Sequence, residues 1–289
     1  MKYAVALGEI GVEGGALLAQ VCSFADAGFD AMSFSPTQLM ALTEKEQSEL
    51  RACLDERKLQ CTLHGGFDTP PSDLHKLADL LAGGLVSVTF DPILHWTAAG
   101  QLYDTQQMCG YLAELDVDAA KYGFSYGIED FPETAAAFRF YRENLAPLAA
   151  TSRFGILVDV GHLNVSRCQY GYHTDVTTEA YFAGLPLPLL EVHLSDNHGT
   201  RDEHLPLGAG DIDFHAVARG LAQRGFDGLS TIEIVPSQHG GDHAQLLSQT
   251  LDSLAFWRGM TDAPETNDSA EQEDGKSGGH HSRPGLSPL

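Results

Sequence analysis

The sequence is short of basic residues and of long apolar runs. Its 289 residues include 17 Lys and Arg against 40 Asp and Glu, which gives a formal net charge of −23 at pH 7. Such an excess of negative charge repels phosphate backbones and argues against nucleic acid as a main partner. No apolar run reaches the roughly 18 residues that a membrane span requires, so we expect no membrane partner.

Cysteine is also scarce. The five cysteines, Cys22, Cys53, Cys61, Cys109 and Cys168, are odd in number and widely spaced. No pair has the close spacing of a CxxC metal or redox motif, and reduced thiols in a cytosol are the simplest interpretation. The N-terminal segment turns polar too soon for a signal peptide. Together these absences predict a cytoplasmic location.

What the sequence does contain is an alternation of short apolar strands and longer helices, repeated eight times. This pattern implies a parallel sheet of the α/β class, and eight units in about 260 residues have the size of a (β/α)8 TIM barrel. A doubly wound open sheet is the competing layout. The barrel is preferred because it gathers the ends of all strands at one mouth, where the sequence places polar residues. The predicted strands are residues 3–7, 29–34, 59–64, 85–90, 124–129, 154–159, 190–194 and 229–234. The predicted helices are residues 14–27, 43 onward, 72–83, 105–122, 133–149, 177–183, 213–223 and 242–258.

The composition changes near the C-terminus. Residues 261–289 are rich in Asp, Glu, Ser, Gly and Pro and nearly free of large apolar side chains. Such a segment cannot bury enough apolar surface to offset the entropy lost on ordering. The sequence therefore predicts a barrel over residues 1–260 and a disordered acidic tail over residues 261–289.

Histidines and carboxylates cluster at the ends of the predicted strands. His193 ends the seventh strand, and Asp202 and His204 follow in its loop. Their nitrogen and oxygen atoms can face one point, as a divalent metal requires. The other strands from the third onward end in the same residue types. These further residues are His64, Asp91, Glu129, Asp159 with His162 three residues on, and Glu233.

Taken singly, these residues have ordinary explanations. His64 could be a hydrogen-bonded core residue, Asp159 a helix cap and Glu129 the partner of an arginine. Gathered at one mouth, so many carboxylates and histidines would suffer from desolvation and repulsion unless cations or extensive pairing relieved them. Few basic residues lie near them in the sequence, so we predict a bound divalent metal. Mixed ligands of this kind suit Mn, Zn, Co or Fe, and Mg fits less well where two histidines bind.

Five short motifs follow the predicted strand ends. They are IED at residues 128–130, VDVGH at 158–162, VHLSD at 192–196, RDEHLPLG at 201–208 and TIE at 231–233. Together they resemble the xylose-isomerase-like TIM-barrel superfamily, over roughly residues 1–258. That superfamily holds sugar isomerases and epimerases, inosose dehydratases and apurinic endonucleases of the endonuclease IV type. The motif set is specific to the superfamily and not to one reaction.

By this resemblance, Glu129, Asp159, His193 and Glu233 match the single-metal site of the ketose 3-epimerases. There the two glutamates hold the metal and act as acid and base, so Glu129 and Glu233 are the predicted catalytic residues and His162 would bind substrate. The metal would polarise a carbonyl while a carboxylate removes the neighbouring proton. The expected function is that of a divalent-metal-dependent isomerase or epimerase acting on a sugar or sugar phosphate.

Two alternatives stay open. In the endonuclease-type pattern His64, Asp202 and His204 match additional metal ligands, whereas Asp91 stands where that pattern has a histidine, a departure that bears on the third metal. Such a site would hydrolyse a phosphodiester, and the acidic surface favours a small substrate over DNA. The other alternative is a barrel that binds a metabolite without turning it over, although such a barrel has no need of Glu129 and Glu233 together.

Substrate contacts are the least defined feature of the sequence. Arg201 could hold a phosphate or carboxylate of the substrate, or pair at the surface with Asp202 or Glu203. His198 could support the site or lie exposed to solvent. The long loop over residues 163–177, with Arg167, His173 and Asp175, is the predicted specificity loop. Aromatic residues that could stack on a sugar ring, or simply pack, are Trp96, Trp257, Phe67, Phe131 and Tyr170. The sequence leaves the substrate and a homo-oligomer open.

Overall fold

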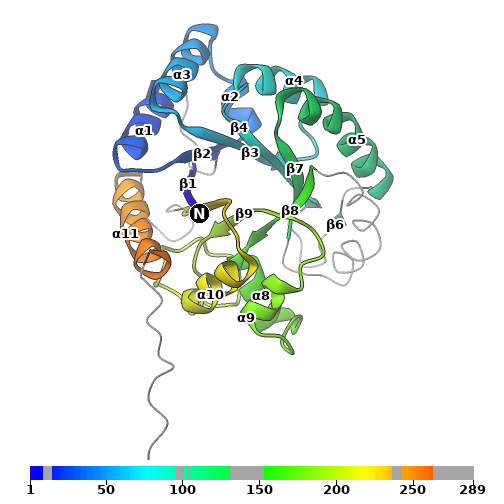
Figure 1. Ribbon diagram of the computed structural model, residues 1–289, viewed down its shortest axis with the longest axis vertical. Helices are drawn as coiled ribbons and strands as arrows, with labels where there is room; N and C mark the ends of the chain where they lie inside the picture. Colours follow the sequence, from blue (N-terminus) through cyan, green and yellow to red (C-terminus); the bar gives the residue numbers. More distant parts are fainter. Residues whose placement is uncertain (9–14, 96–100, 103, 131–152, 236–242, 263–289) are drawn as a thin grey trace, which may run out of the picture.

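Eight parallel strands close into a barrel with helices around it (Figure 1). The computed structural model describes residues 1–8, 15–95, 101, 102, 104–130, 153–235 and 243–262. The strand order around the barrel is β1-β10-β9-β8-β7-β4-β3-β2, which confirms the predicted TIM barrel and excludes the open sheet. The barrel strands are β1 (Lys2–Ala6), β2 (Ala31–Phe34), β3 (Gln60–Gly66), β4 (Leu85–Asp91), β7 (Ser125–Glu129), β8 (Phe154–Asp159), β9 (Leu189–Leu194) and β10 (Leu229–Ile232).

The closing pair of the barrel joins the first strand to the last. Strands β1 and β10 run parallel in register, with Lys2 opposite Leu229 and Val5 opposite Ile232. The barrel therefore closes only when β10, near the end of the predicted domain, pairs with β1 at its start. A small antiparallel hairpin outside the barrel follows β4 and consists of β5 (Ile93–His95) and β6 (Gln101–Leu102).

Most of the described helices begin at a side chain that caps their first turn. Before α3, for example, Thr43 Oγ1 accepts a hydrogen bond from the Glu46 backbone N–H, and Glu46 Oε2 accepts one from the Thr43 backbone N–H, as in a capping box.

None of the helices in the described residues is long and apolar enough to cross a bilayer. The predicted helix over residues 133–149 and the tail from residue 263 lie outside the described residues. The described helices are α1 (Gly15–Asp26), α2 (Pro36–Met40), α3 (Glu44–Arg57), α4 (Pro71–Leu80), α5 (Thr105–Tyr122), α8 (Val160–Tyr170), α9 (Thr178–Ala183), α10 (Phe214–Arg224) and α11 (His243–Thr261).

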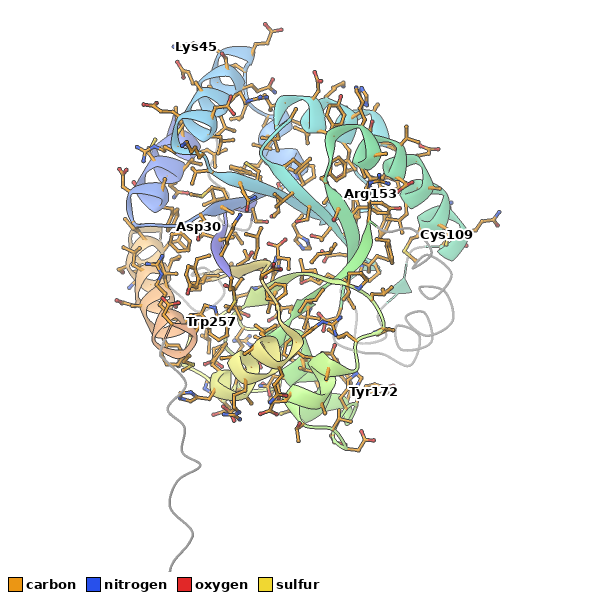
Figure 2. The ribbon with its side chains drawn as sticks, viewed as in Figure 1. Asp30, Lys45, Cys109, Arg153, Tyr172 and Trp257 are labelled. Carbon is orange, nitrogen blue, oxygen red and sulfur yellow. The ribbon has the colours of Figure 1, made fainter. Side chains whose placement is uncertain are left out.

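The apolar core lies mainly between the barrel and its helices. Trp257 shows the pattern, because it is fully buried on α11 and its indole N–H donates to Ser230 Oγ at 3.1 Å (Figure 2). Phe67 packs against Phe90, with ring centroids 4.8 Å apart. Of the two alternatives given for Trp257, sugar stacking and packing, the structure supports packing. Trp96 and Phe131 lie outside the described residues.

Part of the predicted specificity loop is a helix. Helix α8 covers Val160–Tyr170, and Gly171 ends it with a left-handed φ of 71°. Arg167 donates to Thr178 Oγ1 at 2.7 Å and to the Val176 carbonyl at 3.2 Å, so it ties α8 to the start of α9. The predicted loop is thus wrong for residues 163–170, because the cap described below starts a helix directly after β8.

Candidate metal centre

Four side chains converge at the carboxyl end of four neighbouring strands. Glu129 ends β7, Asp159 ends β8, His193 lies on β9 and Glu233 directly follows β10. All four are buried, and one ligand-type atom from each lies within 4.8 Å of the others. His193 Nδ1 is 2.9 Å from Glu233 Oε2 and 3.5 Å from Glu129 Oε1. We call Glu129, Asp159, His193 and Glu233 the central group. Its mixture of imidazole and carboxylate donors around one point is what a divalent transition-metal ion binds.

Buried polar atoms without hydrogen-bond partners show that this donor set fits a cation. Asp159 Oδ2 and both ring nitrogens of His193 make no hydrogen bond, although all are sealed from solvent. The close approach of Glu233 Oε2 to His193 Nδ1 does not have hydrogen-bond geometry. Buried polar atoms are nearly always satisfied, because leaving one unpaired costs about 1–3 kcal/mol. A cation at the point where these atoms meet would satisfy them together.

The two carboxylate oxygens of Asp159 have different roles, one in capping a helix and one in the central group. Its Oδ1 accepts a hydrogen bond from the His162 backbone N–H at 2.9 Å and so caps α8. Its Oδ2 has no hydrogen bond and belongs to the central group. The helix cap therefore holds the carboxylate in place and leaves one oxygen for a ligand.

The loop after β9 brings Asp202 and His204 back to the mouth. Asp196 and Leu205 exchange two backbone hydrogen bonds of 2.9 Å, which turns the loop back on itself. His204 Nε2 lies 2.6 Å from Asp202 Oδ2, and the same oxygen lies 3.2 Å from His162 Nε2. Asp202 Oδ1 and His204 Nδ1 are buried without hydrogen bonds. We call His162, Asp202 and His204 the loop group.

His64 and Asp91 complete the opposite side of the mouth. His64 Nδ1 lies 3.0 Å from Thr89 Oγ1, a contact that orients the ring. Its Nε2 lies 3.3 Å from Glu129 Oε2 and 3.4 Å from Asp91 Oδ1. His64, Glu129 and His193 also meet the distance criterion for a metal site. Every predicted metal ligand is thus at the mouth, although their roles as ligands stay predictions.

Asp130 positions two residues of the site, a role that its place in the sequence does not predict. The His162 Nδ1–H donates to the Asp130 carbonyl at 2.7 Å. The Asp130 carboxylate accepts hydrogen bonds from the Asp159 backbone N–H at 2.6 Å and from the Tyr181 hydroxyl at 3.1 Å. Asp130 therefore fixes both the orientation of His162 and the end of β8.

A second residue without a predicted role, Glu191, lies deeper in the barrel. It is fully buried on β9, two residues before His193, and its Oε1 lies 3.7 Å from His193 Nε2. The available signal was the alternation of side chains along a strand, which turns residues 191 and 193 to the same side. Glu191 is not the last polar residue of its strand, and it was therefore not predicted as a site residue.

Opposite charges lie close together across the mouth and shift the pKa values of its residues. Burial lowers the pKa of His64, but the carboxylates around it, Asp91 first among them, raise it to about 9. Burial raises the pKa of Glu233, but the positive charge on His193 lowers it to about 2. Burial, reinforced by the Asp91 carboxyl, raises the pKa of Glu129 well above its ordinary value. Protonated imidazoles therefore neutralise the carboxylates, and a divalent cation can supply that charge instead.

The two remaining predicted substrate contacts lie at the edge of the site. Arg201 Nε lies 3.5 Å from Glu203 Oε1, and 68% of its side chain is exposed. His198 Nδ1 and its backbone N–H both lie 2.9 Å from Glu203 Oε2. Both residues are thus paired with Glu203 at the surface, and a role in substrate binding stays a prediction for each.

Solved structures of low sequence identity share this fold over their whole length. A D-psicose 3-epimerase from Clostridium cellulolyticum H10 in complex with D-tagatose has a TM-score of 0.68 at 15% identity, covering 90% of this chain and 99% of that one. A D-tagatose 3-epimerase-like protein has a TM-score of 0.66 at 20% identity, with coverages of 91% and 98%. The IolI protein with a bound zinc atom has a TM-score of 0.66 at 14% identity, with coverages of 90% and 99%. At these identities the similarity shows the fold.

Sequence comparisons give a family. An uncharacterised protein of Methanocaldococcus jannaschii is 30% identical over 125 residues, which are 42% of this chain and 41% of that protein. The chain thus matches about two fifths of the length of this curated relative. The family model described as xylose isomerase-like TIM barrel matches residues 104–258, more than half of the chain and the part that supplies most of the mouth. The chain belongs to the xylose isomerase-like TIM barrel family.

Proposed function

We propose that the protein is a divalent-metal-dependent isomerase or epimerase of a sugar or sugar phosphate. The observation that carries the proposal is the central group, in which two glutamates, an aspartate and a histidine converge, all of them buried. Glu129 ends β7 and Glu233 directly follows β10, and two other strands lie between β7 and β10 in the barrel order. A small substrate above the central group would therefore have one carboxylate on either side.

The residues of the central group would divide the work of a proton transfer. The metal, once bound by Glu129, Asp159, His193 and Glu233, would polarise the substrate carbonyl and make the adjacent C–H more acidic. One of the two glutamates then takes the proton from that carbon, and the other delivers a proton on the opposite face or at the neighbouring atom. His162, held by Asp130 at 2.7 Å, would orient a substrate hydroxyl. Mn, Zn, Co or Fe suits these ligands better than Mg.

Proteins of the same fold support this reaction class. Among them are the D-psicose 3-epimerase with D-tagatose and an L-ribulose 3-epimerase, whose names specify sugar epimerisation. The IolI protein binds a zinc atom. These relatives support a sugar as substrate and a transition metal as cofactor for this chain, while the buried central group supplies the local argument.

Metal content and proton exchange test the proposal. We expect one bound ion per chain by elemental mass spectrometry after loading with Mn²⁺ or Zn²⁺. In D₂O, a panel of ketoses and sugar phosphates should then show deuterium incorporation next to a carbonyl by NMR. Glu233→Gln should abolish this incorporation, because an amide cannot accept the proton, whereas Glu179→Gln on the outer surface should not affect it. Exchange that survives Glu233→Gln would contradict the acid–base assignment.

A multi-metal phosphodiesterase is the second candidate, and the loop group favours it. His162, Asp202 and His204 lie within hydrogen-bonding distance in a chain, and buried atoms of Asp202 and His204 have no partners. A second or third ion there would activate water for attack on a phosphodiester. We expect this candidate to show two or three ions per chain, with Asp202→Ala and His204→Ala each losing one. A single ion that is unaffected by either substitution would exclude it.

A further inference from the structure

Glu191 is a carboxylate sealed inside the barrel, below the central group. Its side chain is fully buried, as is that of His193, and one residue separates the two on β9. Successive side chains of a strand alternate, so both point to the same side. That side is the barrel interior, because Glu191 contacts hydroxyl groups from three other barrel strands, β3, β4 and β10.

All three hydroxyl groups donate to Glu191. Thr62 Oγ1 donates to Oε1 at 3.5 Å, Ser87 Oγ donates to Oε2 at 3.3 Å, and Thr231 Oγ1 also donates to Oε1. No lysine or arginine among the described residues contacts this carboxylate. Burying an acid without a cationic partner is costly, and a threonine or leucine would fill a barrel interior at lower cost. Packing alone therefore does not explain Glu191.

The imidazole of His193 is the nearest basic group to Glu191 for which a contact is seen. His193 Nε2 lies 3.7 Å from Glu191 Oε1, whereas Nδ1 faces Glu233 and Glu129. A neutral imidazole carries hydrogen on one nitrogen, and only the other nitrogen can bind a metal. An acceptor on the Nε2 side favours hydrogen there and leaves the Nδ1 lone pair directed toward the two glutamates of the central group.

We propose that Glu191 is a positioning residue that fixes the tautomer and the ring orientation of His193, so that Nδ1 serves as the metal ligand. Carboxylates behind metal-binding histidines raise ligand basicity in this way. The separation of 3.7 Å exceeds a normal hydrogen bond, so Glu191 acts here on the ring through its charge. The inference rests on the proposed function, because it requires a cation at the central group.

The test compares, in the full chain, a substitution of Glu191 itself with a substitution of one of its hydrogen-bond donors. Glu191→Gln removes the charge and keeps the shape, whereas Ser87→Ala removes one hydroxyl donor and keeps the carboxylate. Co²⁺ titration should give one ion per chain in both variants. Affinity should fall about tenfold or more for Glu191→Gln and stay within about twofold for Ser87→Ala. The visible Co²⁺ spectrum should shift only for Glu191→Gln. In ¹⁵N NMR of the Zn²⁺-loaded variant, the His193 ring should show a changed or mixed tautomer.

The outcomes separate this inference from the proposed function. Wild-type protein that binds no Co²⁺ or Zn²⁺ would overturn both. Wild-type protein that binds one ion, with Glu191→Gln matching it in affinity, spectrum and tautomer, would overturn only the positioning role. A lower melting temperature of metal-free Glu191→Gln with unchanged affinity would likewise overturn it in favour of a structural role. If Glu191→Gln fails to fold, Glu191→Asp keeps the charge farther from His193 and should show an intermediate loss of affinity.

Discussion

Each imidazole of the mouth has a carboxylate beside it, and this pairing determines how the site responds to pH. His204 lies 2.6 Å from Asp202, and His193 lies 2.9 Å from Glu233. Burial lowers the pKa of His204, but the hydrogen bond and charge of Asp202 raise it to about 9. A metal ion binds only the deprotonated ligands, so it must displace protons that the metal-stripped site holds at neutral pH.

We therefore expect metal loading to release protons. Affinity for Zn²⁺ or Mn²⁺ should rise with pH between about 6 and 8, by up to about tenfold per pH unit for each proton displaced. The sign follows because the raised histidine pKa values make protons competitors of the metal at lower pH. Calorimetric titration of metal-stripped protein in buffers of different ionisation enthalpy measures the number of protons. His75→Ala, on the surface, serves as control, and an affinity independent of pH would contradict the expectation.

For single residues, the sequence predicted which side chains lie at the mouth better than it predicted what each of them does. The last polar residue of each strand from β3 onward lies at the mouth, because parallel strands of a barrel end together. Glu191 and Asp130 escaped prediction because their function depends on contacts with other strands. For Arg201 the sequence left a substrate contact and a surface pair with Asp202 or Glu203 both open, and only the folded loop shows that Glu203 pairs with Arg201 and with His198.

Among the elements, the loop after β9 depends on one buried side chain. The Asp196 carboxylate accepts hydrogen bonds from the backbone N–H groups of residues 197, 208, 210 and 212, at 2.9 to 3.2 Å. Gly210 approaches so closely that an added Cβ would lie 2.4 Å from Asp196 Oδ1. Asp196 therefore holds the loop that carries Asp202 and His204.

Asp196→Asn should destabilise this loop strongly. The amide group turns one acceptor into a donor that faces backbone N–H groups, so we expect a loss of about 2–4 kcal/mol in the free energy of unfolding. Urea denaturation followed by circular dichroism measures the loss. Asp211→Asn, an exposed residue of the same loop, should change stability by less than about 0.5 kcal/mol. Equal stability of the two variants would show that Asp196 does not anchor the loop.

Regular elements were easier to predict than the connections between them. The short apolar runs located the ends of the barrel strands to within about two residues, because a strand buried on both faces is apolar along most of its length. Helix α8 was missed because it begins directly after β8, where a polar stretch resembled a loop. The approach of Cys22 to Cys53, with sulfurs 3.5 Å apart between α1 and α3, follows only from helix packing.

Across the whole molecule, a formal charge of −23 opposes folding by repulsion. At the mouth, protonated imidazoles offset the carboxylates, and a bound divalent cation would take over that role. Metal that binds only the folded state also stabilises it by mass action. The free energy of unfolding should therefore be clearly higher with the metal bound than without it.

We expect metal loading to raise the melting temperature. At a free metal concentration of about 100 times Kd, the gain is about 2.7 kcal/mol, which corresponds to about 5–10 °C for a protein of this size. Differential scanning calorimetry of chelator-treated protein, with and without Zn²⁺ or Mn²⁺, measures the shift. Glu233→Gln protein, treated identically, should show a much smaller shift. An equal shift in both proteins would mean that the stabilising ion binds elsewhere.

The position of Glu233 has a consequence for how the protein is made. It directly follows β10, the strand that closes the barrel against β1, whereas Glu129, Asp159 and His193 come earlier in the chain. A chain growing on the ribosome therefore acquires its last central-group residue at the same step that allows the barrel to close. Chains that end before β10 lack Glu233, one of the four members of the central group. Binding of the proposed ion by all four residues would thereby depend on the same strand that closes the barrel against β1.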